Sequence, residues 1–348
     1  MKITKKTFPS PKGEITWYEL TNAQGASVVL STMGAGIVEV RVPDKDGKIE
    51  NVALSYENAA DYIADGPCLG KCPGRYANRI AKGHIEVDGK EYHLAINNGP
   101  NALHGGPEGF QNQNWAAEEI ADGVKFTYNA KDGEENYPGN LTVTATYHWS
   151  DSNKLELDFH AESDADTVVN MTNHAYWNLD GADAGSIFNH EMKLKAANWL
   201  PTDETQIPTG EIAAVASTPM DFTEFKKIGK DIKEDFEALR IGKGYDHCWV
   251  IDGWKPGLMV ENAVELRAEN SGRKLTVSSD QPGVQVYTGN WLAGCPKNKS
   301  GKSYEDYEGV AIEMQGFPDA PNKEGFPSQL LKAGESYDRK IIFAFSAE

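Results

Sequence analysis

The chain has 348 residues, of which 39% are hydrophobic and 25% charged, a composition typical of a globular protein that can bury a sizeable core. Its formal net charge of −18 disfavours binding to nucleic-acid phosphates and to anionic membranes. The segment MKITKKTFPS has no apolar run behind it, and no stretch of the sequence is apolar for long enough to cross a membrane. We therefore expect a cytoplasmic protein without nucleic-acid or membrane partners.

Strand-like segments dominate the chain from its N-terminal part to its end. They are short, rich in β-branched and aromatic residues, and mostly alternating, and they are separated by turn sequences such as DKDGK and ENSGR. They cover 26–44, 90–96, 123–130, 141–150, 154–163, 262–270, 273–280, 282–291 and 338–348. Helical periodicity occurs only in 56–65 and 231–240. No linker or repeat interrupts this pattern, so it predicts an all-β fold: one large antiparallel β-sandwich with a few short helices, forming a single domain over 1–348.

Two of the four cysteines lie close together, Cys68 and Cys72 in CLGKC. Since no secretory signal precedes them, free thiols are expected rather than a disulfide. No further ligands are spaced around this pair for zinc, and we predict no metal site.

The segment NMTNHAYWNL, residues 170–179, combines amides, aromatic rings and one histidine. Interpreted as a strand, it has an apolar face and a polar face that carries Thr172, His174, Tyr176 and Asn178. The polar face lacks the charged residues of a solvated surface, which favours a cleft containing His174 and Tyr176. A core histidine bonded to neighbouring amides is the alternative. Asn173 falls on the apolar face and needs a buried partner.

Glu313 lies between Ile312 and Met314 in the apolar run GVAIEM. A buried glutamate is rare without a partner, and desolvation raises its pKa toward the range of a general base. The alternative is a structural hydrogen-bonding anchor. This residue is the most informative one in the chain.

Further polar residues stand in short, glycine-flanked or alternating segments. His104 precedes two glycines in NALHGG, Arg75 and Arg79 occur in CPGRYANRIAKG, Asp246 precedes a strand in GYDHCWVID, and Gln281 begins QPGVQVYTGNW. Each has an ordinary structural explanation when it is taken alone. As a set, amides, carboxylates, an arginine and aromatic rings fit the hydroxyls and the apolar face of a neutral sugar.

The chain resembles the aldose 1-epimerase family over nearly its whole length, from about residue 10 to the C-terminal strand. The resemblance is carried by segments in the family's order, namely GRYANRIAKG, LHGGPEGF, NYPGNL, TNHAYWNL, YDH, PGVQVYTGN and PDAPN. Trp177 stands where the family often has phenylalanine. The resemblance implies a β-supersandwich that interconverts the α and β anomers of a free aldose such as galactose or glucose, without a cofactor or a metal.

The resemblance also implies roles for individual residues. Glu313 matches the family's general base, His174 matches its general acid, and His104 matches a histidine that polarises the reacting oxygens. Four further positions would hold sugar hydroxyls: Asn78, Arg79, Asp246 and Gln281. The expected assembly is a monomer or a homodimer.

Three other functions use similar residues. A non-catalytic sugar-binding module could use the same cleft, although it would not need both Glu313 and His174. A glycoside hydrolase could pair Asp246 with Glu313, and the distance between two carboxylates decides the geometry of that reaction. A hexose-6-phosphate 1-epimerase on the same fold would need extra basic residues, which the sequence does not clearly show.

Overall fold

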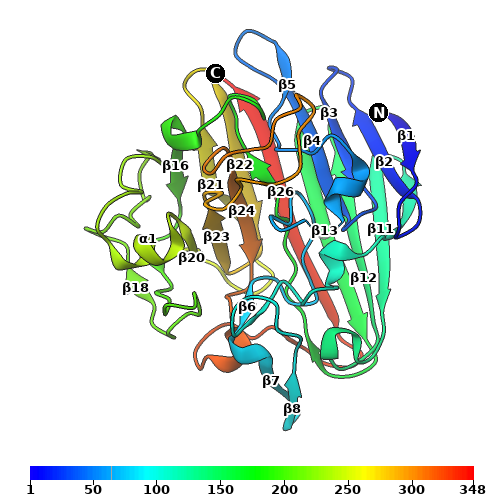
Figure 1. The fold of residues 1–348 in the computed structure, drawn as a ribbon, viewed down its shortest axis with the longest axis vertical. Helices are drawn as coiled ribbons and strands as arrows, with labels where there is room; N and C mark the ends of the chain where they lie inside the picture. Colours follow the sequence, from blue (N-terminus) through cyan, green and yellow to red (C-terminus); the bar gives the residue numbers. More distant parts are fainter. Residues whose placement is uncertain (64) are drawn as a thin grey trace.

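The structure is a computed structural model that describes residues 1–63 and 65–348. Strands make up most of its regular structure, and the strands that form its sheets pair in antiparallel fashion. The predicted all-β sandwich is confirmed (Figure 1). No helix in the described residues is long and apolar enough to cross a membrane.

A nine-stranded sheet forms one layer of the sandwich. Its strands, in spatial order, are β10 (Ala116–Ile120), β11 (Gly123–Ala130), β12 (Leu141–Trp149), β13 (Lys154–Ser163), β26 (Ser336–Ala347), β22 (Arg273–Ser279), β21 (Val260–Arg267), β16 (Glu191–Leu194) and β19 (Lys226–Lys227).

Two smaller sheets form the other layer. One has five strands in the order β1 (Lys2–Phe8), β2 (Ile15–Thr21), β3 (Ser27–Ser31), β4 (Gly36–Pro43) and β5 (Ile49–Asn51). The other has six, in the order β15 (Tyr176–Trp177), β24 (Val310–Gln315), β23 (Gly283–Tyr287), β20 (Asp246–Val250), β17 (Asn198–Trp199) and β18 (Ala213–Ala214). A bridge between Ala53 and Trp177 joins the two sheets.

The remaining elements are short and connect or flank these layers. Three strand pairs stand apart from the large sheets, β14 (Thr167–Val168) with β25 (Leu330–Leu331), β6 (Arg79–Ile80) with β9 (Ala102–Leu103), and β7 (His84–Val87) with β8 (Lys90–His93). The described helices are α1 (Glu237–Gly242) and the 3-10 turns η1 (Ala59–Tyr62), η2 (Ala81–Gly83), η3 (Phe110–Asn112), η4 (Glu134–Asn136), η5 (Ile187–Asn189) and η6 (Ala320–Asn322).

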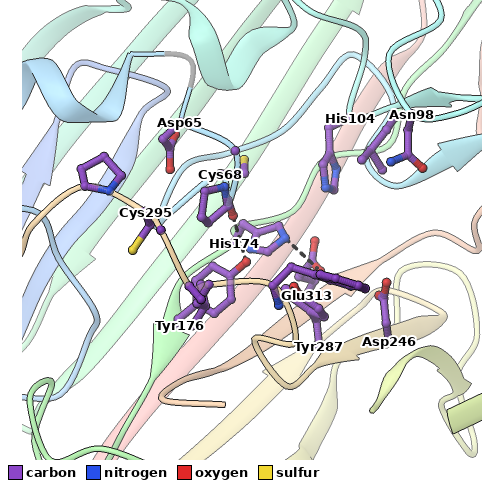
Figure 2. Close-up of a pocket in the computed structure, with 18 of the residues that line it drawn as sticks. Asp65, Cys68, Asn98, His104, His174, Tyr176, Asp246, Tyr287, Cys295 and Glu313 are labelled. Carbon is purple, nitrogen blue, oxygen red and sulfur yellow. Dashed lines mark hydrogen bonds and ion pairs between the residues drawn. The ribbon is translucent and has the colours of Figure 1, made fainter. Parts of the chain in front are cut away.

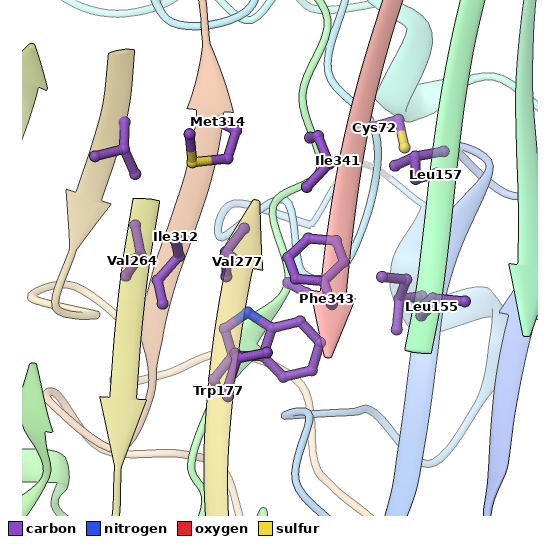
Figure 3. Close-up of a cluster of buried hydrophobic side chains, with 14 of the residues drawn as sticks. Cys72, Leu155, Leu157, Trp177, Val264, Val277, Ile312, Met314, Ile341 and Phe343 are labelled. Carbon is purple, nitrogen blue, oxygen red and sulfur yellow. The ribbon is translucent and has the colours of Figure 1, made fainter. Parts of the chain in front are cut away.

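Apolar side chains from both layers meet in one large core. Trp177 of β15 is fully buried, and its ring centroid lies 5.4 Å from those of Phe343 and Phe345 on β26. Ile312 and Met314 of β24 belong to the same buried cluster (Figure 3). Since side chains alternate along a strand, burying these two residues in the core turns the intervening Glu313 to the opposite face of the six-stranded sheet.

The predicted strand segments all contain strands, with 26–44 divided into β3 and β4, but three other predicted features differ. The helix expected over 231–240 is shifted and shortened to α1 (Glu237–Gly242). The helix expected over 56–65 is only the 3-10 turn η1, and Ala64 lies outside the described residues. The strand expected over 170–179 is reduced to β15 (Tyr176–Trp177), because the backbone N–H and C=O of His174 bond to residues 70 and 71 instead of a neighbouring strand. The N–H of His174 donates to Lys71 O (2.8 Å), and the N–H of Gly70 donates to His174 O (3.0 Å).

The structure identifies the buried partner that Asn173 needs. Its side-chain amide donates to Gly70 O (2.8 Å) and to the Tyr147 hydroxyl (3.2 Å), and its oxygen accepts from the N–H of Ala175 (3.0 Å). Asn173 therefore holds the loop that carries His174 against the nine-stranded sheet. The four cysteines are free and buried, as expected for Cys68 and Cys72.

We predict that Trp177→Ala lowers the free energy of unfolding by about 3–5 kcal/mol, because it leaves a cavity between the two layers. Urea denaturation measures the change. Leu330→Ala serves as the control, because Leu330 is 42% exposed, and it should leave stability nearly unchanged. Equal stability of the two variants would contradict the packing described above.

Candidate active site

A cavity of about 880 Å³ opens on the face of the six-stranded sheet that points away from the core. Tyr176 of β15, Asp246 of β20, Tyr287 of β23 and Glu313 of β24 line it, and loops close the other sides. Figure 2 shows these side chains converging from adjacent strands, with His174 at the centre. The cavity also contains His104, Asn78 and Arg79, so seven of the eight predicted site residues lie together in it.

The centre of the cavity is the pair formed by His174 and Glu313. The Nε2 atom of His174 lies 3.5 Å from Oε1 of Glu313, and both side chains are nearly inaccessible to solvent. Neither His174 Nδ1 nor Glu313 Oε2 has a hydrogen-bond partner among the described residues. Buried polar atoms are normally paired, so an unpaired carboxylate oxygen that faces a cavity indicates a place for a polar ligand.

Burial shifts the pKa values of this pair in opposite directions. Desolvation raises the pKa of Glu313 well above its ordinary value, the negative charge of Asp246 adds to that rise, and Arg79 opposes it. Desolvation lowers the pKa of His174 to about 4. Both residues therefore favour their neutral forms in the cavity without a ligand.

His104 lies against His174, with ring centroids 5.4 Å apart. Its ring Nδ1 accepts a hydrogen bond from the backbone N–H of Asn78 (3.0 Å), while the backbone N–H of His104 donates to Asn78 O (3.0 Å). Burial lowers the pKa of His104 well below its ordinary value, so the ring is neutral and carries its proton on Nε2. His104 is therefore positioned to donate a hydrogen bond into the cavity.

The glycine after His104 permits this arrangement, as the sequence suggested. Gly105 has φ +79°, and a Cβ atom there would lie 2.0 Å from Gly74 O. A side chain at this position would push the two loops apart.

One atom from each of His104, His174 and Glu313 lies within 4.8 Å of the others, close enough for a shared metal ion. A metal would need a lone pair on the remaining ring nitrogen of His104. That nitrogen carries the proton, because Nδ1 is the acceptor for Asn78. The donor set therefore fits proton transfer and hydrogen bonding better than metal coordination.

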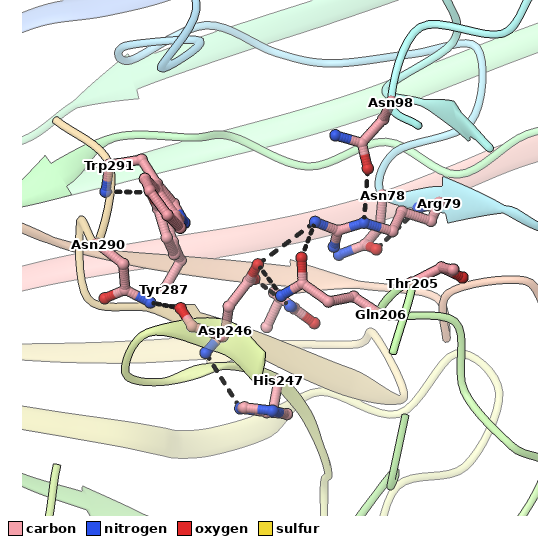
Figure 4. Close-up of polar contacts among 12 residues, drawn as sticks. Asn78, Arg79, Asn98, Thr205, Gln206, Asp246, His247, Tyr287, Asn290 and Trp291 are labelled. Carbon is pink, nitrogen blue, oxygen red and sulfur yellow. Dashed lines mark hydrogen bonds and ion pairs between the residues drawn. The ribbon is translucent and has the colours of Figure 1, made fainter. Parts of the chain in front are cut away.

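A polar network around Asp246 forms one end of the cavity (Figure 4). The Asp246 carboxylate accepts hydrogen bonds from Gln285 Nε2 (2.7 Å) and Gln206 Nε2 (2.8 Å), and it lies 3.5 Å from Nη2 of Arg79. Arg79 also donates to Asn98 Oδ1 (3.1 Å) and to Gln206 Oε1 (2.7 Å). These three partners fix the position of the guanidinium at the cavity wall.

The same network keeps Asp246 ionised. Burial alone would raise its pKa, but the positive charge of Arg79 and the hydrogen bonds from Gln285 and Gln206 outweigh burial, and the net effect lowers the pKa. An ionised carboxylate beside a guanidinium offers strong acceptors and donors to hydroxyl groups.

Gln281, predicted to hold a ligand, does not lie in the cavity, and this prediction needs correction. Its side chain is fully buried and donates to Met171 O (3.1 Å) and to the Tyr337 hydroxyl (3.1 Å). Gln285 is the glutamine that supports the site: it lies opposite Glu313 across β23 and β24 and donates to Asp246 from beneath the cavity lining. The alternation of Gln285 with Tyr287, which lines the cavity, was the signal in the sequence that identifies it.

Other residues near the predicted set have different roles from those expected. Arg75 is buried elsewhere and donates to Pro138 O (2.6 Å) and Thr167 Oγ1 (3.0 Å). Asn178 donates to Gly185 O (2.7 Å) and Glu308 O (2.9 Å), outside the cavity. Asn98 and Gln206 come from loops, and no pattern in the sequence marks them.

An all-β sandwich whose cavity combines an acid–base pair with an arginine, amides and tyrosine rings defines a carbohydrate-active protein. The aldose 1-epimerase family model matches residues 16–344. The galactose mutarotase of Bos taurus is 40% identical over 99% of both chains, and the aldose 1-epimerase of Escherichia coli K12 is 35% identical over 94% of both chains. The chain belongs to the aldose 1-epimerase family, and it is an enzyme of the epimerase class.

Solved structures agree with this assignment. The chain is similar to a crystal structure of an aldose epimerase homologue from C. elegans, with a TM-score of 0.87 and 32% identity over 99% of both chains. It is also similar to galactose 1-epimerase from Lactobacillus acidophilus, with a TM-score of 0.86 and 27% identity, covering 100% of this chain and 99% of that one.

We predict that replacing Gln285 and replacing Gln281 change different properties, the pKa of Asp246 in the first case and the free energy of unfolding in the second. Gln285→Met should raise the pKa of Asp246, because it removes a hydrogen bond to the ionised carboxylate. Gln281→Met should leave that pKa unchanged and instead lower the free energy of unfolding by about 1–3 kcal/mol, because it leaves buried partners unpaired. Carbon-13 NMR titration of the carboxylate and urea denaturation distinguish them. An unchanged Asp246 pKa in Gln285→Met would contradict the network described above.

Proposed function

We propose that this enzyme interconverts the α and β anomers of free aldohexoses, galactose and glucose among them, by acid–base opening of the sugar ring. The observation that carries the proposal is the buried Glu313–His174 pair, whose nitrogen and oxygen lie 3.5 Å apart at the centre of the cavity. The names of its relatives from Bos taurus and Escherichia coli K12 support the same substrate class.

In the proposed reaction, Glu313 is the general base and His174 is the general acid. The carboxylate removes the proton from the C1 hydroxyl, O1 forms a carbonyl with C1, and the C1–O5 bond breaks. The electron pair of that bond goes to O5, which takes the proton from His174. Rotation about C1–C2 presents the other face of the carbonyl, and ring closure reverses both proton transfers.

Ring opening moves one proton, in effect, from His174 to Glu313 through the sugar. Before the step the pair is charged, with a carboxylate and an imidazolium, and after it the pair is neutral. Burial favours the neutral forms of both residues. Because the resting pair is itself neutral, the charged pair forms first by transfer of the proton from Glu313 to His174, whose nitrogen and oxygen lie 3.5 Å apart, and ring opening then restores the neutral forms.

The other cavity residues hold the sugar in place for this transfer. His104 donates from Nε2 to a reacting oxygen, and Arg79 with Asp246 binds the hydroxyl groups on the C2 side of the ring. Asn78 shapes this part of the cavity, since its backbone orients the ring of His104. Tyr176, whose ring centroid lies 5.0 Å from that of His174, supports the imidazole and gives the sugar an apolar contact.

The charge of the cavity favours a neutral sugar over a hexose 6-phosphate. Among the described lining residues, Arg79 is the one side chain with a permanent positive charge, and it already faces Asp246. Asp61, Asp65, Asp246 and Glu313 line the same cavity. A phosphate would therefore meet carboxylates without a free cation to balance it.

We further propose that the enzyme is cytoplasmic, which its four free cysteines support. We also propose that it folds as one domain, which the single family match over residues 16–344 supports. The expected monomer or homodimer stays a prediction, and size-exclusion chromatography with light scattering would decide between the two.

We predict that Glu313→Gln lowers kcat by about 10²–10⁴-fold while galactose binding is retained, because the shape stays and the basicity is lost. His174→Asn should behave similarly. Polarimetry of freshly dissolved α-galactose and α-glucose measures turnover, and calorimetry measures binding. Glu324→Gln, at an exposed glutamate, is the matched control. Near-full activity of Glu313→Gln would refute the assignment of the base, and no acceleration by the unmodified enzyme would favour a non-catalytic sugar-binding protein.

The pKa values predict a bell-shaped dependence of kcat/KM on pH. The reactive pair holds one proton in total. As the pH falls through about 4, the pair gains a second proton and activity is lost, because His174 has its pKa near that value. As the pH rises through the raised pKa of Glu313, the pair loses its proton and activity falls again. A profile that stays flat from pH 3 to pH 10 would contradict the shared proton.

A further inference from the structure

The cavity is larger than one hexose needs. Its volume of about 880 Å³ lies in the upper part of the range of about 300–1,000 Å³ that serves drug-sized ligands. The acid–base pair and the Asp246 network occupy only part of it. The remainder, which we call the outer lobe, is lined by Ala60, Asp61, Ile63, Asp65–Cys68 and Trp291–Pro296.

The outer lobe and the Asp246 network lie on opposite sides of His174. Figure 2 shows Asp65 and Cys295 on one side of the imidazole and Asp246 on the other. The hydroxyl of Tyr176 donates to Pro67 O (2.9 Å) and thereby joins the sheet to the floor of the outer lobe. A ligand centred on His174 and Glu313 can therefore extend into the outer lobe without leaving the cavity.

The roles assigned above decide which part of the sugar faces the outer lobe. The C1 carbon has two ring neighbours, O5 and C2. When O5 lies at His174 and the C2 side lies at Asp246 and Arg79, the C5–C6 edge follows O5 and turns away from Asp246. Position 6 of the hexose then points toward the outer lobe.

The chemistry of the outer lobe suits a neutral sugar. Trp291 is 66% exposed, an unusual state for so large an apolar surface, and it lies at the rim of the cavity. Its backbone N–H donates to the hydroxyl of Tyr287 (2.9 Å), and Lys243 Nζ lies 4.2 Å from its ring centroid. These contacts hold an indole that can pack on the apolar face of a sugar ring.

The charged groups in the outer lobe disfavour an anionic occupant. The side chain of Asp65 is buried and forms an ion pair with Lys71 beneath the cavity surface, so this lysine is not free to bind a ligand. The described lining of the outer lobe contains the carboxylates of Asp61 and Asp65 and several apolar side chains, but no lysine or arginine. Lys243, which lies against Trp291 at the rim, is paired with Asp306.

We propose that the outer lobe binds a second, neutral sugar ring linked through position 6 of the reducing hexose, so that the enzyme acts on 1→6-linked reducing disaccharides. This inference rests on the proposed function. Only the hemiacetal of the reducing ring opens and closes, by the same proton transfers, and the glycosidic bond stays intact.

The test compares melibiose and isomaltose, which are 1→6-linked, with lactose and maltose, which are 1→4-linked, and with glucose. NMR exchange between α and β signals at subsaturating sugar gives kcat/KM for each one. We expect a higher value for the 1→6-linked sugars than for the 1→4-linked ones. Trp291→Ala should lower the 1→6 value by about threefold to tenfold, the effect of losing one aromatic contact, and change the glucose value by less than about twofold.

A second variant fills the outer lobe from its other wall. A Cβ atom on Gly66 would meet no heavy atom within 4 Å, so Gly66→Leu is compatible with the fold. It should also reduce turnover of the 1→6-linked sugars and spare glucose. Ile212→Ala, at a residue that is 48% exposed and outside the cavity lining, is the control for both variants.

Three results would overturn the inference. Equal turnover of 1→4-linked and 1→6-linked sugars would contradict the orientation of position 6. If the enzyme turned over glucose but not the 1→6-linked disaccharides, the outer lobe would not bind a second sugar ring. The same conclusion would follow if Trp291→Ala lowered kcat/KM equally for glucose and for the 1→6-linked disaccharides. Failure on glucose as well would refute the proposed function itself.

Discussion

The site depends on a carboxylate that the fold removes from water without pairing both of its oxygens. Glu313 stands on a central strand between Ile312 and Met314, whose side chains are locked in the core. The strand therefore cannot rotate Glu313 toward solvent, and its Oε2 has no partner among the described residues. Such a group costs stability in the empty protein and gains its partner when a hydroxyl enters.

Two carboxylates of the cavity, Glu313 and Asp246, have pKa values shifted in opposite directions by their surroundings. Asp246 faces Arg79 and two glutamine amides, so its charge is stabilised. Glu313 has no comparable donor, and it lies close enough to Asp246 for that charge to raise its pKa further. One carboxylate is thereby kept for binding and the other for accepting a proton, a division that arises from Arg79, Gln206, Asp246 and Gln285, which come from four separate segments of the chain.

Most of the site residues predicted from the sequence line the cavity, although each local pattern taken alone had an ordinary structural explanation. Glu313 stood out because an acidic residue interrupts an apolar strand, and His174 stood out because amides and rings replace the charges of a solvated face. The role of Gln281 was taken from the family resemblance, and it fails because this residue lies outside the strand that reaches the site. Gln281 and Gln285 both point to the same side by alternation, but the first lies before the strand, where it bonds to Met171 and Tyr337 instead of Asp246.

The sequence by itself determined the all-β class and the positions of the long strands, because alternation is a local property of the chain. Local patterns marked Glu313 and His174 as candidates, and the roles of base and acid came from the resemblance to the family. Only the tertiary structure decided what surrounds them. Gln206 and Asn98 contact Arg79 from loops without any periodic pattern, and Asn173 finds its partners in Gly70 and Tyr147. The outer lobe likewise exists only where the loops around Gly66 and Trp291 meet. Contacts such as that of Arg79 with Gln206, 127 residues apart, and that of Asn173 with Gly70, 103 residues apart, depend on how the sheets and loops pack, which local sequence does not specify.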